Sequence, residues 1–167
     1  NISDIEKEGI LYMAEEEKLA EDTYTTLNKR WNLRVFANIG RAEGTHVAAV
    51  RTLISRYALK DPTTGDIGEF SNPQLQTAYN ELVSKGDKSL KDALEVGAEI
   101  EEIDILDLQQ RIGQTDKADI KLVYDNLMGG SGNHLRAFVS NLGRDGYKYS
   151  PQHLNQQAYN DIINSKT

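Results

Sequence analysis

Hydrophobic residues recur at steps of three and four along most of the chain, a spacing that is typical of α-helices with one buried face. Ser3 and Glu6 form the capping-box pattern that begins a helix, and Ser89 and Asp92 repeat it in the second half of the chain. No segment alternates in the way that a β-strand does. The helices that this pattern predicts span about residues 4–31, 34–59, 73–84, 89–113, 116–141 and 151–164.

The helical period breaks after the second predicted helix, where Asp61 and Gly65 supply turn chemistry and Asn72 is placed to cap a short helix. Each of the four long helices has one apolar stripe, so the helices need one another to bury it. Short connections predict antiparallel neighbours, and a long connection can cross the length of a bundle. We predict an all-α fold in a single domain of residues 1–167. It is a ferritin-like four-helix bundle with a long crossover that carries the short helix, followed by a short C-terminal helix.

The composition narrows the classes of protein and of site. The 167 residues suffice for one domain with a core, and 19 Lys and Arg against 26 Asp and Glu give a net charge of -7. This acidic balance argues against a nucleic-acid partner held through its phosphates. The chain has no cysteine, which excludes disulfides, thiolate zinc sites and iron–sulfur clusters. Any metal must therefore be held by carboxylates and imidazoles.

No apolar run approaches the ~20 residues that a transmembrane helix needs, so we expect a soluble protein without a membrane span. The chain begins at Asn1 rather than at a methionine, from which we expect that a segment has been removed. The compartment stays open, because the protein is either cytoplasmic or exported after removal of a signal.

Acidic and imidazole side chains interrupt the apolar stripes of all four long helices at positions that helical spacing places inside the bundle. These residues are Glu17, Glu43, His46, Glu101, Asp104 and His134. Several buried carboxylates would repel one another and cost many kcal/mol if nothing compensated them. A pair of divalent cations would supply the missing positive charge.

Glu43 and His46 are three residues apart, so their side chains point the same way from one helix. Three residues advance a helix by about 300° and ~4.5 Å, which lets a carboxylate and an imidazole chelate one metal. Opposed by a lone Glu on a neighbouring helix, Glu-x-x-His is the half-site of a carboxylate-bridged dimetal centre. We expect two divalent metal ions as cofactors, with iron first and manganese or zinc as alternatives.

Most of these residues fall in four segments of the chain. The segments are Met13–Tyr24, Ile39–His46, Gly97–Leu108 and Gly130–Phe138. In this order they resemble the ferritin-like family catalogued as domain of unknown function 2202, and the resemblance spans about residues 4–164. It implies a four-helix bundle related to rubrerythrin and bacterioferritin, with a dinuclear metal site and no settled activity.

The resemblance also implies roles for individual residues. Glu17 would be the ligand from the first helix, Glu43 the bridging carboxylate of the second, and His46 its terminal imidazole. Glu101 would be the ligand from the third helix, and His134 the imidazole of the fourth. The family pattern requires a second Glu-x-x-His on that fourth helix.

Here the pattern departs from the family, because the position three residues before His134 is Ser131. Asp104 follows Glu101 by three residues and is the candidate replacement for the missing carboxylate. Rubrerythrin-like sites similarly carry an extra acid on the third helix. We therefore expect an asymmetric site, with one metal held by Glu43 and His46 and the other by His134, Glu101 and Asp104.

The ligand from the third long helix and the role of Tyr24 each have an alternative interpretation. If the third long helix is rotated by one residue, Glu99 or Glu102 replaces Glu101 as its ligand. Tyr24 is either a hydrogen-bonding or redox-active residue beside the metals or a core residue with a satisfied hydroxyl.

Several neighbours of these residues are expected to have no part in the site. Glu15 and Glu16 should lie on a solvated face of the first helix, Lys18 on an exposed face, and His153 at the surface. The glycines around Ser131 either let another group approach the helix closely, through a π-bulge or a missing side chain, or break the helix. They are Gly129, Gly130 and Gly132.

These features favour a di-iron oxidoreductase in which ferrous ions react with dioxygen or hydrogen peroxide, with no catalytic residue assigned. One alternative is a non-catalytic module in which metal ions only neutralise buried acids, and a second is iron storage. Whether the protein is an enzyme stays open. The expected partners are metal ions and dioxygen or peroxide, with a homodimer as an open possibility.

Overall fold

The computed structural model describes residues 1–165, in which there are six helices and no β-strand. Four of the helices are long and two are short. Their bounds are α1 Asp4–Trp31, α2 Arg34–Arg56, α3 Pro73–Gly86, α4 Leu90–Ile112, α5 Ala118–Arg144 and α6 Gln156–Ile163. The all-helical class predicted from the sequence is confirmed for this part of the chain.

Three helix starts follow from local capping. The backbone N–H of Glu6 donates to the Ser3 hydroxyl, and the N–H of Ser3 donates to the Glu6 carboxylate, which completes the predicted capping box of α1. Asn72 caps α3 through its side-chain oxygen, and Ser89 caps α4 in the same way. These starts are confirmed.

Three helices differ most from the prediction in their bounds. α2 ends at Arg56 rather than at 59, because Ala58 takes a left-handed conformation with φ 53° that no helix continues. α5 begins at Ala118 and continues to Arg144, so it starts later and ends later than predicted. α6 begins at Gln156 and not at 151, because the chain before it is held by contacts to α4.

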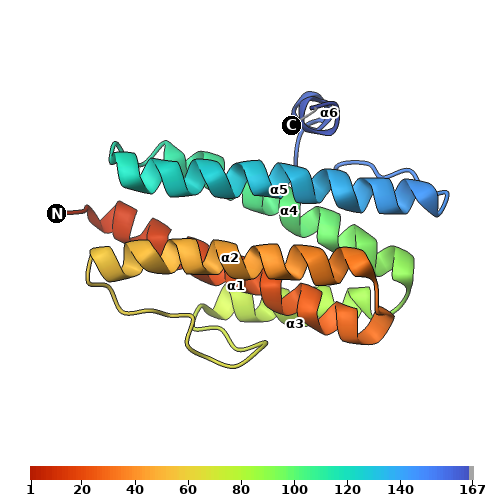
Figure 1. Cartoon of the computed structure of the whole chain (residues 1–167), viewed down its shortest axis with the longest axis horizontal. Coiled ribbons are helices and arrows are strands. Elements are labelled where there is room, and N and C mark those ends of the chain that lie inside the picture. Colours follow the sequence, from red (N-terminus) through yellow and green to blue (C-terminus); the bar gives the residue numbers. More distant parts are fainter. Residues whose placement is uncertain (166–167) are drawn as a thin grey trace.

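The four long helices lie lengthwise beside one another (Figure 1). α1 packs along α2, and α4 packs along α5, while α1 also contacts α4 and α2 contacts α5. α3 covers α1 and α4, and α6 lies against the outer side of α5. Within the described residues, no helix has the length and apolar character needed to cross a membrane.

The apolar core divides into two clusters along the long helices. One cluster surrounds Tyr24, Phe36 and Phe138, whose rings contact one another, and the other surrounds Met13 and Leu127. Polar side chains lie between the two clusters on α1, α2 and α5, whereas on α4 Glu101 and Asp104 lie within the span of the first cluster. The candidate site therefore lies at mid-length, with apolar packing on both sides.

The long connection between α2 and α3 is fastened to α1 by charged residues that are buried. The Lys18 ammonium donates to Asp22 at 2.6 Å and to the backbone carbonyls of Asp66 and Glu69, each at 2.9 Å. The expectation that Lys18 and Glu15 lie on exposed or solvated faces is wrong. Tertiary contacts to the connection cover both side chains, and helical spacing alone cannot reveal such contacts.

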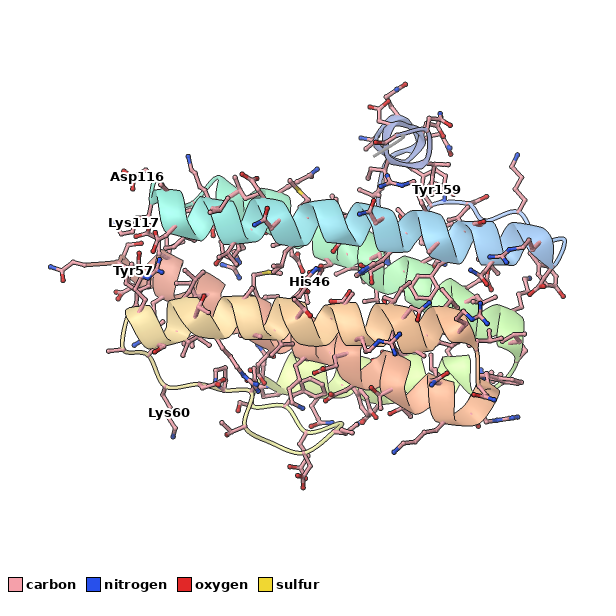
Figure 2. All side chains as sticks on the ribbon, viewed as in Figure 1. His46, Tyr57, Lys60, Asp116, Lys117 and Tyr159 are labelled. Carbon is pink, nitrogen blue, oxygen red and sulfur yellow. The ribbon has the colours of Figure 1, made fainter. Side chains whose placement is uncertain are left out.

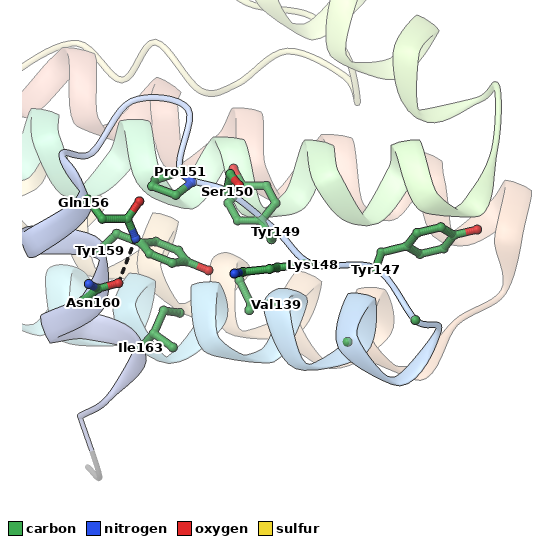
Figure 3. Close-up of a pocket in the computed structure, with 12 residues that line it drawn as sticks. Val139, Tyr147, Lys148, Tyr149, Ser150, Pro151, Gln156, Tyr159, Asn160 and Ile163 are labelled. Carbon is green, nitrogen blue, oxygen red and sulfur yellow. Dashed lines mark hydrogen bonds between the residues drawn. The ribbon is translucent and has the colours of Figure 1, made fainter.

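The segment between α5 and α6 runs beside α5 and leaves an open pocket of about 730 Å³ (Figure 3). The rings of Tyr149 and Tyr159 lie 6.0 Å apart at this place. The Tyr149 hydroxyl donates to Glu102 on α4, and the backbone N–H groups of residues 152–154 donate to the same carboxylate. Glu102 thus fastens the C-terminal segment to the helices.

Candidate metal centre

Two overlapping groups of side chains meet at mid-length between the long helices. Glu17, Glu43 and His46 form the first group, and in each group the ligand atoms lie within 4.8 Å of one another. Glu43, Glu101 and His134 form the second group. Glu43 belongs to both groups, so the two groups share one carboxylate.

The distances assign one oxygen of Glu43 to each histidine. His46 Nδ1 lies 3.2 Å from Glu43 Oε2 and 3.1 Å from Glu17 Oε1. His134 Nδ1 lies 2.8 Å from Glu43 Oε1 and 3.6 Å from Glu101 Oε1. The two imidazole rings are stacked with their centroids 5.5 Å apart. The pair of groups is therefore nearly symmetric about Glu43.

Burial differs between the carboxylates and the imidazoles. The side chains of Glu17, Glu43 and Glu101 are 0% exposed, whereas those of His46 and His134 are 14% and 10% exposed. Figure 2 shows His46 between α2 and α5. The histidines therefore form the side of the centre that is nearest to solvent, at the boundary between these two helices.

Several carboxylate oxygens at the centre have no hydrogen-bond donor. Among the described residues, the buried oxygens without a partner include Glu16 Oε1, Glu17 Oε2, Glu101 Oε1 and Asp104 Oδ1. A buried acceptor that lacks a donor costs about 1–3 kcal/mol, and more when it is charged. Oxygen and imidazole donors gathered in this way fit divalent iron or manganese. The residues present thus suit the metal pair that the sequence predicts.

The ionisation of the centre reflects this excess of acid. Burial raises the pKa of Glu17, with repulsion from Asp104 and Glu43 as further causes. Burial and the charge of Glu43 raise the pKa of Glu101 to about 7. Burial also opposes ionisation of Glu43, but hydrogen bonds from His134 and His46 outweigh it and lower the pKa of that carboxyl.

The pKa values of the two histidines are raised as well, which favours the charged form of each imidazole. Burial lowers the pKa of His134, but the charges of Glu101 and Glu43 and the hydrogen bond to Glu43 outweigh burial and raise it to about 10. The pKa of His46 is likewise raised, because its contacts with Glu43 outweigh burial. Protons on these groups therefore offset the carboxylates when no cation does, and a bound cation would displace them.

Asp104 lies beside the two groups and belongs to neither. The Ser131 hydroxyl donates to Asp104 Oδ2 at 2.5 Å, and the Asp104 charge adds to burial in raising the pKa of both Glu16 and Glu17. Its contacts are therefore on the side of Glu17, whereas the sequence suggested a place with Glu101 and His134. A role for Asp104 as a ligand stays a prediction.

Tyr24 contacts the centre directly. Its hydroxyl donates to Glu101 Oε2 at 2.5 Å and lies 3.3 Å from the backbone oxygen of Gly97. The ring is completely buried among the aromatic residues of the core. Tyr24 is thus a core residue that also holds a candidate ligand, which leaves Glu101 Oε1 on the side of His134.

The two alternatives to Glu101 on α4 point elsewhere. Glu102 accepts its hydrogen bonds from the C-terminal segment, and Glu99 contacts His153 at 3.2 Å and Lys85 at 3.8 Å. Neither carboxylate is in a group that could hold a cation. Glu101 is therefore the member that α4 contributes, and His153 is exposed as expected.

The glycine cluster of α5 has a site-related role at one position. α5 is continuous through Gly129, Gly130 and Gly132, so the alternative of a helix break is wrong. A Cβ at Gly130 would lie 2.6 Å from Cε1 and 2.7 Å from Nε2 of His46, whereas a Cβ at Gly129 would meet nothing within 4 Å. The missing side chain at Gly130 lets the His46 imidazole lie against the backbone of α5.

Glu16 lies beside the centre although it is not among the site residues that the sequence predicts. It was expected on a solvated face, and this is wrong, because its carboxyl is buried and reaches Asp104 and Asp107. A signal was present, since Glu16 follows Tyr12 by four residues and precedes Leu19 by three, which places it between two large side chains of one helix face.

Comparison with known proteins assigns the family. Residues 6–166 match the family described as "Uncharacterized protein domain (DUF2202)", and the chain belongs to this family. It is 52% identical over 167 residues to "Uncharacterized protein MJ0754" of Methanocaldococcus jannaschii, with 99% of this chain and 90% of the relative covered. The crystal structure of hypothetical protein MJ0754 from Methanococcus jannaschii matches with a TM-score of 0.98 at 51% identity, covering 100% of this chain and 96% of that chain.

Proposed function

We propose that the protein is a ferritin-like four-helix bundle that holds two divalent metal ions, iron first, and acts as an oxidoreductase towards dioxygen or hydrogen peroxide. The observation that carries this proposal is the position of Glu43, whose two oxygens lie beside two different histidines. A site for a single cation would not require the two oxygens of one carboxylate to face different histidines. Glu43 lies between Glu17 and Glu101, and each of these two carboxylates has one oxygen without a hydrogen-bond donor.

In this proposal each cation has its own carboxylate and imidazole. Glu17 and His46 would hold one ion, Glu101 and His134 would hold the other, and Glu43 would bridge the two. The first group draws its residues from α1 and α2, and the second adds α4 and α5. All four long helices thus contribute to the centre.

When bound, two ferrous ions would supply two electrons, which with two protons reduce dioxygen to hydrogen peroxide or hydrogen peroxide to two water molecules. The chain's own residues prepare the site for such chemistry. Complete burial of Glu17, Glu43 and Glu101 keeps bulk water from the carboxylates. The Tyr24 hydroxyl holds Glu101 in one orientation, which preserves the geometry of the second group.

A non-catalytic metal-binding module is the second candidate, and Ser131 is the observation that favours it. Ser131 donates to Asp104 where the family pattern has a metal-binding carboxylate, so the centre as a whole has one carboxylate fewer than that pattern implies. Such a centre would bind cations and stabilise the fold without turnover. No feature of the described residues favours iron storage in particular.

Ferrous iron added without oxygen, followed by dioxygen or peroxide, separates the two candidates. We expect two iron ions per chain and rapid oxidation of both. Glu43→Gln should lose this stoichiometry, whereas Asp125→Asn, on the exposed face of α5, should keep it. Two bound ions that neither oxidant oxidises would support the non-catalytic module. Absence of iron binding in the native protein would contradict both candidates.

A further inference from the structure

A small apolar pocket lies between α1, α3 and α4, on the side of the centre away from the histidines. It has a volume of about 140 Å³. Most of its wall consists of the side chains of Leu19, Leu75, Ala78, Leu82, Ile100 and Ile103. The short helix α3 therefore forms one wall of the pocket. The other wall is formed by α1 and α4, the helices that carry Glu17 and Glu101.

The pocket adjoins the acids of the metal centre. Ile100 and Ile103 directly precede Glu101 and Asp104 on α4, and Glu16, which lines the pocket, directly precedes Glu17 on α1. Asp104 lies close enough to both Glu16 and Glu17 to interact electrostatically with each. Glu16 and Asp104 are thus the layer that separates the pocket from the first metal-binding group.

The lining selects the kind of molecule that fits. A cavity of about 150 Å³ lined by aliphatic side chains stays dry and binds small apolar molecules such as xenon or benzene. A metal ion would find only one carboxylate there, that of Glu16. Hydrogen peroxide would recover few of its hydrogen bonds to water, because Tyr12, Glu16 and Gln74 are the polar residues of an otherwise aliphatic lining. A small neutral apolar molecule loses nothing by entering.

We propose that this pocket binds dioxygen and delivers it to the metal centre past Glu16, which makes dioxygen rather than peroxide the oxidant. The proposal rests on the proposed function and adds its substrate. Dioxygen then reaches the centre from the apolar pocket beside α3. The opposite side of the centre, between α2 and α5, carries the partly exposed histidines.

Xenon under pressure tests the pocket without any metal. Crystals of the native chain should bind xenon between α1, α3 and α4, and crystals of Ala78→Phe, which fills the pocket, should not. Thr77→Phe places the same ring on the exposed face of α3 and should bind xenon as the native chain does. Ala78→Leu is a smaller filling variant that replaces Ala78→Phe if the larger ring prevents folding.

The same variants then test delivery of the oxidant. With iron bound, the filling variant should slow oxidation by dioxygen about tenfold, while oxidation by peroxide and the number of bound ions stay as in Thr77→Phe. No xenon in the native pocket, or an unchanged dioxygen rate in a variant that excludes xenon, would overturn the proposal. If native protein oxidises iron with neither reagent, the proposed function fails and dioxygen delivery fails with it, although xenon binding would still identify an apolar ligand site.

Discussion

Two kinds of buried carboxylate lie side by side in this protein. On α4, Glu101 and Glu102 are adjacent in sequence and both are 0% exposed. Glu102 accepts hydrogen bonds from three backbone N–H groups and from Tyr149, so both of its oxygens are satisfied. Glu101 has one donor, Tyr24, and one oxygen with none.

The same contrast occurs on α1. Glu15 accepts from the backbone N–H groups of Ser71 and Asn72, whereas Glu17, two residues later, keeps one oxygen without a donor. Burial of an acid is therefore no sign of a metal site by itself. A satisfied carboxylate fastens a loop to a helix, and an unsatisfied one indicates a charge that something else must neutralise.

The adjacent pair on α4 gives the largest expected effect. Glu102→Gln replaces an acceptor oxygen by an N–H₂ donor that faces other donors, and we expect it to lower the free energy of unfolding by about 2–4 kcal/mol. Glu101→Gln removes a buried negative charge from a repulsive cluster, so it should raise the stability of metal-free protein at pH 8. Urea denaturation measures both, and equal signs for the two variants would refute the distinction.

Metal affinity should depend on the carboxylates of the centre and not on those that fasten loops to helices. Glu43→Gln removes a ligand from both groups and should weaken binding of divalent manganese or iron by about 100-fold or more. Loss of a residue that only hydrogen-bonds to a metal ligand already lowers metal affinity about 10–100-fold. Glu15→Gln should leave the affinity unchanged while loosening the connection before α3. Calorimetric titration with Mn²⁺ measures the affinity. Native-like binding by Glu43→Gln would exclude a bridging role.

The stability of the metal-free protein should fall as pH rises from 5 to 8. Burial and the charge of Glu43 raise the pKa of Glu101 to about 7 in the folded chain, against an ordinary value of 4.5, so the folded state keeps a proton that the unfolded chain has lost. His134, with a pKa raised to about 10 from 6.5, extends the decline above pH 7. We expect a loss of roughly 1–3 kcal/mol across this window.

Saturating metal should reverse this trend, because ligands bind cations only after they lose their protons. The midpoint of urea unfolding should therefore fall with pH in the presence of a chelator and rise with pH in the presence of Mn²⁺. Parallel pH profiles in the two conditions would mean that the cations bind away from Glu101 and His134.

The smallest expected effect comes from two neighbouring glycines. Gly129→Ala adds a methyl group in open space and should stabilise α5 by about 0.5–1 kcal/mol without changing metal affinity. Gly130→Ala forces its methyl group against the His46 imidazole and should weaken metal binding severalfold despite the same gain in helix propensity. Equal affinities in the two variants would show that His46 is free to move aside.

The helices could be predicted from the sequence because apolar spacing and caps are local. Ser3, Asn72 and Ser89 begin their helices through contacts within three residues. The start of α6 could not be predicted in this way, because Glu102, some 50 residues away, holds the backbone that precedes it. Lys18 was misplaced for the same reason, since its partners lie in the connection before α3.

The candidate site was predictable to the extent that helix geometry decides which side chains face inward. Glu43 and His46 at i and i+3, and the inward-facing positions of Glu17 and His134, follow from the 3.6-residue period. The place of Asp104 did not follow, because its contacts with Ser131 and Glu16 depend on how α4, α5 and α1 rotate against one another. Those rotations are set by core packing rather than by spacing along one helix.

Anomalous scattering from crystals of the protein loaded with Mn²⁺ or Fe²⁺ tests for a dimetal centre bridged by Glu43. We expect two peaks about 3.5–4 Å apart, one beside Glu17 and His46 and the other beside Glu101 and His134, with Glu43 between them. Glu15 and Glu102 should have no metal near them. A single peak at the centre, or metal at the loop-fastening carboxylates instead, would contradict a dimetal centre bridged by Glu43.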